Sequence, residues 1–73
     1  MKMELHIGDE IKKELAIQER FVAWLASKID YDSSNLHKLL MSPNIKHKRL
    51  YEISKALKKD FFSLYSQQLS EEK

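Results

Sequence analysis

Apolar residues recur every three or four positions in separate segments of this chain, a spacing typical of α-helices rather than β-strands. Ile7, Ile11 and Leu15 follow it with charged residues between them, so the sequence predicts an amphipathic helix over about residues 7–19. The 73 residues include one glycine, one proline and no cysteine. This composition excludes a disulfide or thiolate-zinc framework and disfavours a turn-rich β fold. We therefore expect an all-α protein stabilised by a single apolar core.

Helix-starting and helix-breaking residues divide the rest of the chain. The sequence predicts a short second helix from near Phe21 to Ile29, a third from about Ser33, a fourth from about Lys46 and a fifth after Asp60. Asp32 and Asp60 are suited to cap the third and fifth helices, because a carboxylate accepts a hydrogen bond from an otherwise unpaired first-turn amide. Pro43 disfavours helix in the residue before it, so residues 42–44 should form a loop. The expected core residues of these helices are Val22, Leu25, Ala26, Ile29, Leu36, Leu39, Leu40, Leu50, Ile53, Ala56, Leu57, Phe61, Phe62, Leu64 and Tyr65.

Charge is distributed unevenly along the chain. Residues 1–32 carry five Lys or Arg against seven Asp or Glu, residues 33–59 carry seven against one, and residues 60–73 carry one against three. A basic middle between acidic ends can present one face to a polyanion and repel it elsewhere. Solvated lysines without any ligand explain the same composition, so the charge pattern needs support from the fold.

The junction between the second and third predicted helices constrains the fold further. About three residues join the two helices, so they must cross sharply, and Ala26 supplies the small residue needed where they approach. The turn follows at Asp30, four residues after Ala26, and apolar residues follow ten and thirteen residues after it, at Leu36 and Leu39. This spacing resembles the helix-turn-helix of the lambda repressor and Cro superfamily, also called the xenobiotic-response-element type. The motif occupies about residues 21–40.

The resemblance extends across about residues 7–65, where one helix before the motif, a loop containing proline and one or two closing helices match the family's arrangement. It implies a compact four- to five-helix, lambda repressor-like bundle over residues 1–69, followed by a polar tail at residues 70–73. The family often has glycine with a positive φ at the turn, a conformation that Asp30 enters more readily than most residues do. At the start of the second helix, where the family often has a polar residue that reaches a phosphate, this chain has Phe21.

The resemblance implies that the third helix lies in the major groove of DNA, with its N-terminal residues at the base edges. Carried over by position, the base-edge contacts are Ser33, Ser34, His37 and Lys38, and the phosphate contacts are Tyr31, Asn35, Asn44, Lys46 and Lys48. Lys38 can reach guanine O6 or N7, whereas the loop lysines supply affinity without reading sequence. The implied function is sequence-specific binding of double-stranded DNA by a cytoplasmic bacterial or phage transcriptional regulator of the repressor type. The oligomeric state, including a homodimer, is left open.

Other interpretations of the same residues stay open. Ser33 and Ser34 are also favourable first-turn residues of a helix, and the lysines also suit a solvated helix face. The main alternative function is a helical protein-protein interaction module, such as an antitoxin or an adaptor. Its docking surface would be the third helix or the aromatic segment of Phe61, Phe62 and Tyr65.

Several function classes find no support in the sequence. There is no glycine-rich phosphate loop, no HExxH motif and no cysteine nucleophile, so we expect no enzyme, no cofactor and no small-molecule substrate. His37 and His47 lack the cysteine or close carboxylate that would complete a metal site. Trp24 is expected to pack at the rim of the second helix. Because no apolar run approaches the roughly 20 residues that cross a bilayer, we expect a soluble, cytoplasmic protein with no membrane partner.

Overall fold

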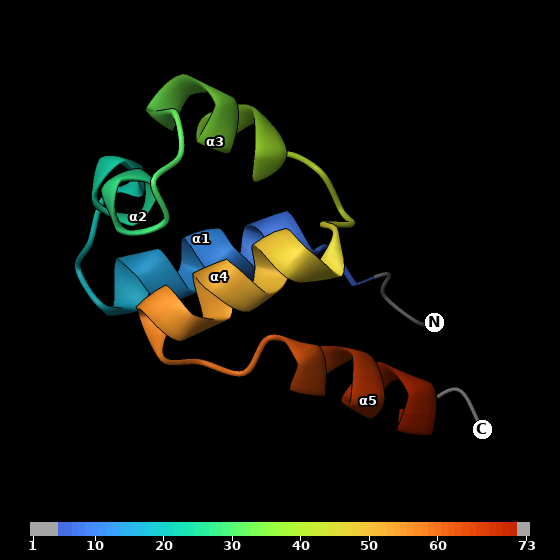
Figure 1. Cartoon of the computed structure of the whole chain (residues 1–73). Coiled ribbons are helices and arrows are strands. Elements are labelled where there is room, and N and C mark those ends of the chain that lie inside the picture. The colour runs from blue at the N-terminus through green and yellow to red at the C-terminus, as the bar shows by residue number, and fades with distance from the viewer. Residues whose placement is uncertain (1–4, 72–73) are drawn as a thin grey trace.

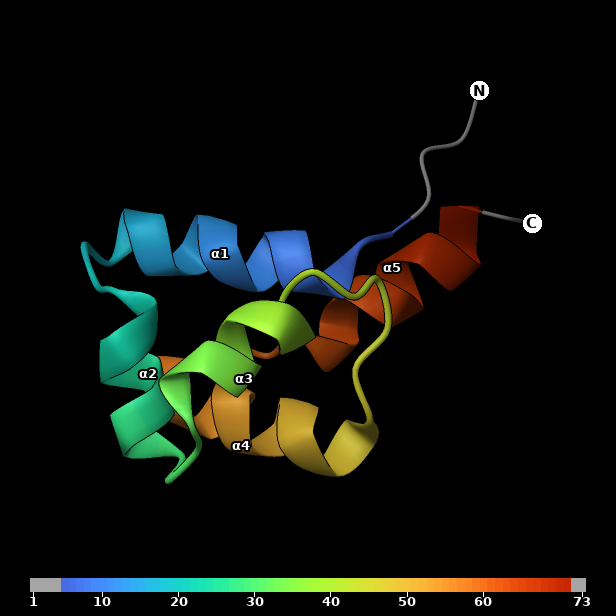
Figure 2. The ribbon, with the colours of Figure 1, turned by 90° about the horizontal axis from the view of Figure 1, so that it is seen from above.

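The computed structural model describes residues 5–71. This part of the chain contains five helices joined by short loops. They are α1 (Ile7–Ile17), α2 (Val22–Lys28), α3 (Ser33–Leu39), α4 (His47–Leu57) and α5 (Phe62–Glu71) (Figure 1). Residues 5–71 form no strand, so the all-helical prediction is confirmed. Seen from above, α1 and α4 run along opposite sides of α3, with α2 across one end of the group and α5 toward the other (Figure 2). No helix in this range is both long enough and apolar enough to cross a membrane.

One cluster of buried apolar side chains joins the helices. Its members are Ile7, Ile11, Leu15, Leu25, Ala26, Ile29, Leu36, Leu40, Ile45, Leu50, Ile53, Leu57 and Phe61. The predicted core residues Val22, Leu39, Ala56 and Leu64 pack against this cluster while staying partly exposed. Ile45, in the loop between α3 and α4, is a core residue that the sequence analysis did not identify. Helical spacing cannot select it because it lies outside a helix.

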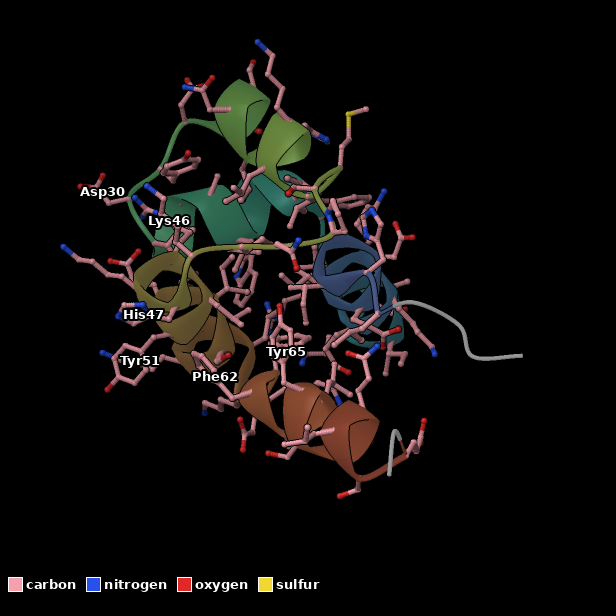
Figure 3. All side chains as sticks on the ribbon, turned by 90° about the vertical axis from the view of Figure 1, so that its right-hand side faces the viewer. Asp30, Lys46, His47, Tyr51, Phe62 and Tyr65 are labelled. Atoms are coloured by element: carbon pink, nitrogen blue, oxygen red, sulfur yellow. The ribbon has the colours of Figure 1, made fainter. Side chains whose placement is uncertain are left out.

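The prediction that Phe62 and Tyr65 are core residues is wrong. They are 37% and 36% exposed, on a helix that has no buried residue. Phe61, which directly precedes α5, is fully buried and is the aromatic residue of this segment that belongs to the core. Both side chains extend from α5, which lies at the outside of the bundle, and each keeps more than a third of its surface exposed (Figure 3).

Both predicted carboxylate caps are present. At the start of α3, the Asn35 amide donates a hydrogen bond of 3.0 Å to the Asp32 carboxylate. Just before α5, the amides of Phe62 and Ser63 donate to the Asp60 carboxylate at 3.0 and 3.2 Å. These bonds satisfy first-turn amides that have no partner inside their own helix, which is why the two helices begin where the sequence predicts.

Two helices end elsewhere than predicted. α1 stops at Ile17 because Glu19 has a φ of 57°, and the Arg20 amide then donates to the Leu15 carbonyl at 2.8 Å. α5 continues to Glu71, past the point where the sequence predicts the polar tail to begin. The last two residues of that predicted tail lie outside the described range.

The turn between α2 and α3 is short and one residue longer than the sequence predicts. Residues 29–32 join the two helices, and Ala26 is buried where they contact each other. Asp30 has a φ of 54°, which confirms the left-handed conformation expected of it. The Tyr31 amide donates to the Ala26 carbonyl at 2.8 Å and closes the turn.

The N-terminal end of α1 is hydrogen-bonded to the loop that follows α3. The Ile7 amide donates to the Pro43 carbonyl at 3.0 Å, and the Gly8 amide donates to the Ser42 carbonyl at 3.3 Å. A Cβ atom on Gly8 would overlap the Leu40 carbonyl and lie 2.8 Å from the Ser42 oxygen. The only glycine of the chain therefore lets the backbone of α1 contact the segment after α3 directly.

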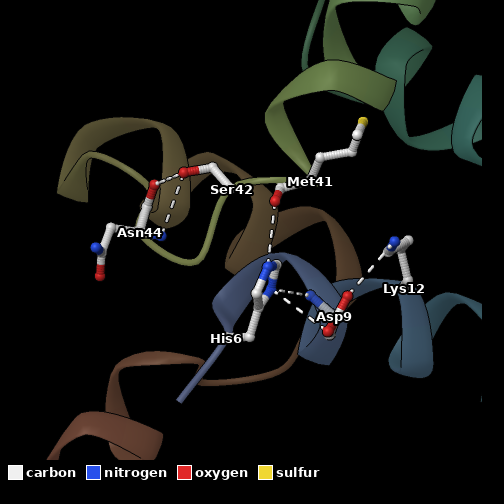
Figure 4. Close-up of polar contacts among 6 residues, drawn as sticks. All are labelled: His6, Asp9, Lys12, Met41, Ser42 and Asn44. Carbon is white, nitrogen blue, oxygen red and sulfur yellow. Dashed lines mark hydrogen bonds and ion pairs between the residues drawn. The ribbon is translucent and has the colours of Figure 1, made fainter. Parts of the chain in front are cut away.

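The His6 side chain makes a further link at this junction (Figure 4). Its Nδ1 accepts a hydrogen bond of 3.1 Å from the Asp9 amide, which caps α1. Nε2 therefore carries the proton and donates to the Met41 carbonyl at 3.2 Å. The Asp9 carboxylate in turn lies 3.5 Å from the Lys12 ammonium. Through His6, the start of α1 fixes the backbone just beyond the C-terminal end of α3.

Candidate functional site

α3 is held by its apolar side and presents its polar side to solvent. Leu36 is fully buried, and Leu40, just after the helix, is also part of the core. Ser34, His37 and Lys38 are exposed. Residues three or four apart are neighbours on a helix surface, so these three side chains form one continuous polar surface, which we call the α3 face.

The other two candidate residues of α3 have different surroundings. Ser33, the first residue of the helix, is half-buried, whereas Ser34 is exposed. Asn35 is exposed, and its backbone amide is already occupied by the Asp32 cap. Of the four predicted base-edge residues, three therefore share the α3 face and Ser33 lies at its edge.

The loop between α3 and α4 and the first turn of α4 carry a second group of exposed residues. Asn44 and Lys46 in the loop and Lys48 in α4 are exposed, while Ile45 is buried and anchors the loop. The Ser42 hydroxyl donates to the Asn44 carbonyl at 2.7 Å and accepts from the Asn44 amide at 3.3 Å (Figure 4). The three predicted phosphate-contacting residues of this segment therefore stand on an anchored backbone.

The lysines of this region are not neutralised by neighbouring carboxylates. Within residues 5–71, Lys38, Lys46 and Lys48 form no ion pair, whereas Lys59 on another part of the surface lies 3.9 Å from Glu14. Positive charge that is not paired within the protein attracts anions from solution. The α3 face and the adjoining loop are therefore suited to a polyanionic ligand.

Tyr31 is less accessible than the other predicted phosphate-contacting residues. It is half-buried against the core, and the Arg49 guanidinium lies 4.3 Å from the centre of its ring, within range of a cation–π interaction. Arg49 also forms an ion pair with Glu52 at 2.6 Å. Sequence analysis did not select Arg49. The available signal was its position three residues after Lys46, at the start of a predicted helix.

Met41 is a further residue of this surface that the sequence analysis missed. It lies directly after α3 and is 71% exposed. It follows Lys38 by three residues and His37 by four, the spacing of neighbours on a helix. Its amide donates to the Lys38 carbonyl at 3.1 Å, so the chain still turns tightly at this point. The spacing from Lys38 and His37 was the available signal, but spacing alone does not distinguish an exposed apolar residue from one in the core.

The aromatic residues of α2 lie apart from the α3 face. Trp24 packs against the rim of the core, as predicted, with the Arg20 guanidinium 4.0 Å and the Lys28 ammonium 5.7 Å from its ring centre. Phe21 precedes α2 and is 84% exposed. The start of α2 therefore offers an apolar side chain where the resembled family often has a polar one.

The histidines of the basic segment are not part of a metal-binding cluster in the described chain. His37 and His47 are both exposed. Within residues 5–71, no three His, Asp or Glu side chains gather closely enough to hold a metal ion. His37 is therefore available as a hydrogen-bonding group of the α3 face.

Comparison with known proteins found no matching family model, no matching curated protein and no matching solved structure.

Proposed function

We propose that this protein binds double-stranded DNA through a helix-turn-helix of the lambda repressor and Cro type, formed by α2 and α3. α3 enters the major groove, and the loop before α4 lies along the phosphates. The α3 face carries the proposal, because its polar side chains project from a helix whose other side is fixed by the core. Lys46 and Lys48, which follow α3 in the chain, are exposed and form no ion pair within residues 5–71. The proposed role is that of a bacterial or phage transcriptional regulator.

The side chains of the proposed interface have two roles. Lys38 donates to guanine O6 or N7, and Ser34 and His37 form hydrogen bonds to neighbouring base edges. Lys46 and Lys48 bind phosphates, which fixes the register of α3 and supplies affinity on any sequence. The flanking contacts in the proposal are Ser33 at the base edges and Tyr31, Asn35 and Asn44 at the phosphates.

The proposal is tested by selecting bound duplexes from a random library and comparing two variants with the native protein. Lys38→Ala should relax the base preference at one position, since it removes a contact to a base edge. Lys46→Ala should lower affinity equally on all sequences, since it removes a phosphate contact. Loss of base preference in both variants would contradict these roles. Failure of the native protein to bind any duplex at low salt would contradict DNA binding itself.

Asp32→Asn should strengthen DNA binding without loosening α3. Asparagine keeps a side-chain oxygen for the Asn35 amide, while the removed carboxylate no longer repels phosphates near the start of α3. We expect affinity at low salt to rise by up to about fivefold, the size of an exposed charge interaction. Asp32→Ala, which also loses the cap, should lower the free energy of unfolding by about 1 kcal/mol. Duplex titration and urea denaturation measure the two effects, and unchanged affinity in Asp32→Asn would show that the carboxylate lies away from DNA.

One observation favours the alternative function of a protein-binding module. Phe62, Tyr65 and Leu69 are exposed on α5, away from the α3 face. A module that binds another protein through these residues is not expected to bind duplex DNA with a base preference that depends on Lys38. The library selection therefore separates the two functions.

A further inference from the structure

We infer that Met41 contacts the C5-methyl group of a thymine and so adds an apolar element to base recognition. This inference rests on the proposed DNA-binding function. It names a residue and a base feature that the polar side chains of the α3 face do not account for. Three observations lead to it: the exposure of Met41, its position beside Lys38, and the hydrogen bonds that fix its backbone.

Met41 is exposed where the neighbouring apolar residues are covered. Within residues 29–46 it is the only large hydrophobic residue that is exposed, since Ile29, Leu36, Leu40 and Ile45 are buried and Leu39 and Tyr31 are half-buried. The adjacent side chain of Leu40 is 1% exposed, so the core at this point is already filled. The Met41 side chain is therefore available to an external ligand at no cost to the packing of the protein.

The position of Met41 continues the α3 face beyond the end of the helix. Its amide bonds to the Lys38 carbonyl at 3.1 Å, and the Ser42 amide bonds to the Leu39 carbonyl at 3.0 Å. These bonds prolong the helical turn by about one residue, and therefore the spacing rule for helix neighbours still applies to Lys38 and Met41. Met41 is therefore the neighbour of Lys38 at the C-terminal end of the α3 face, within reach of a ligand that contacts Lys38.

The backbone of Met41 is fixed from a second direction. The His6 side chain donates to the Met41 carbonyl at 3.2 Å, from a segment of α1 that is itself bonded to Pro43 and Ser42 (Figure 4). A side chain on a fixed backbone loses less conformational freedom on binding than one on a mobile loop. The thioether keeps enough flexibility of its own to fit an irregular surface.

The major groove offers one apolar group to such a side chain. Hydrogen-bonding groups distinguish most base pairs there, and thymine alone adds a methyl group at C5. Ser34, His37 and Lys38 provide donors and acceptors for the polar edges but no apolar surface for this methyl group. Met41 complements them chemically.

Deoxyuridine provides the test, because it keeps every hydrogen-bonding group of thymine and lacks only the methyl group. Starting from duplexes selected by the native protein, each thymine is replaced singly with deoxyuridine, and affinities are measured by fluorescence anisotropy. At one position of the recognised sequence, the native protein should lose affinity by about fourfold, the value of burying one methyl group. Met41→Ala should bind the thymine duplex and the deoxyuridine duplex with equal affinity. Met41→Leu should keep most of the difference in affinity between these two duplexes.

Two controls make the result specific to Met41. Ile17→Ala removes an equally exposed apolar side chain from α1 and should leave the difference between thymine and deoxyuridine unchanged. Thermal unfolding of Met41→Ala should match the native protein, since the residue contributes little to the core. If no thymine shows the effect, or if the effect persists in Met41→Ala, the inference is overturned while DNA binding stands. If the native protein binds no duplex, the proposed function itself fails.

Discussion

Gly8→Ala is expected to lower the free energy of unfolding by about 3 kcal/mol, because the new methyl group collides with main-chain atoms of two other residues. A Cβ atom at this position overlaps the Leu40 carbonyl, and the Ser42 carbonyl is 2.8 Å away. Neither group can rotate aside as a flexible side chain would. The α1 backbone must move away, which breaks the bonds from Ile7 and Gly8 to the loop. The better helix propensity of alanine offsets only about 1 kcal/mol of this loss.

Urea denaturation followed by circular dichroism measures this effect. Lys13→Ala is the matched control, since it places alanine on the exposed side of the same helix and should change the free energy of unfolding by less than about 0.5 kcal/mol. A Gly8→Ala protein as stable as the native one would show that α1 and the loop do not meet in the way described.

A variant with Lys38, Lys46 and Lys48 all replaced by alanine should lose about a hundredfold in affinity for selected duplexes at moderate salt. This corresponds to roughly 1 kcal/mol for each lost contact. Each phosphate contact also releases counterions and contributes about −0.9 to the slope of log affinity against log salt concentration. Loss of Lys46 and Lys48 should therefore make the slope shallower by about two units. Titrations over a series of salt concentrations measure both quantities.

The control for this variant removes the same charge from elsewhere. Lys13, Lys55 and Lys58 are exposed and lie outside the α3 face and the adjoining loop. Their replacement by alanine lowers the net charge equally but should change affinity by only a fewfold through the general field of the protein. Equal losses in the two triple variants would mean that the protein attracts DNA by net charge alone, with no defined interface.

Much of the local structure could be predicted because its causes are local. The Asp32 and Asp60 carboxylates accept hydrogen bonds from amides only two or three residues further along the chain. Asp30 takes the left-handed conformation within a turn that the spacing of Ala26 and Leu36 already predicts. Each of these features depends on residues close together in sequence. The polar residues of the α3 face could be selected for the same reason, since a helix of known phase exposes a known set of positions.

Features that depend on distant segments could not be predicted. The bond from His6 to Met41 joins residues 35 positions apart, and no pattern within either segment indicates the other. The need for glycine at position 8 likewise arises from the Leu40 carbonyl and not from a turn in its own segment. The wrong assignment of Phe62 and Tyr65 to the core has the same origin. Helical spacing shows which face of α5 is apolar, but not how far from the centre of the bundle that helix lies.

The bonds between the start of α1 and the loop after α3 also bear on how this chain matures during synthesis. α2 and α3 are adjacent in sequence, but with seven residues each they are too short to be stable as isolated helices. The loop after α3 gains its hydrogen bonds to α1 only when it meets the segment of His6, Ile7 and Gly8, which is synthesised much earlier. A nascent chain that ends at α3 therefore lacks the hydrogen bond between His6 and the Met41 carbonyl.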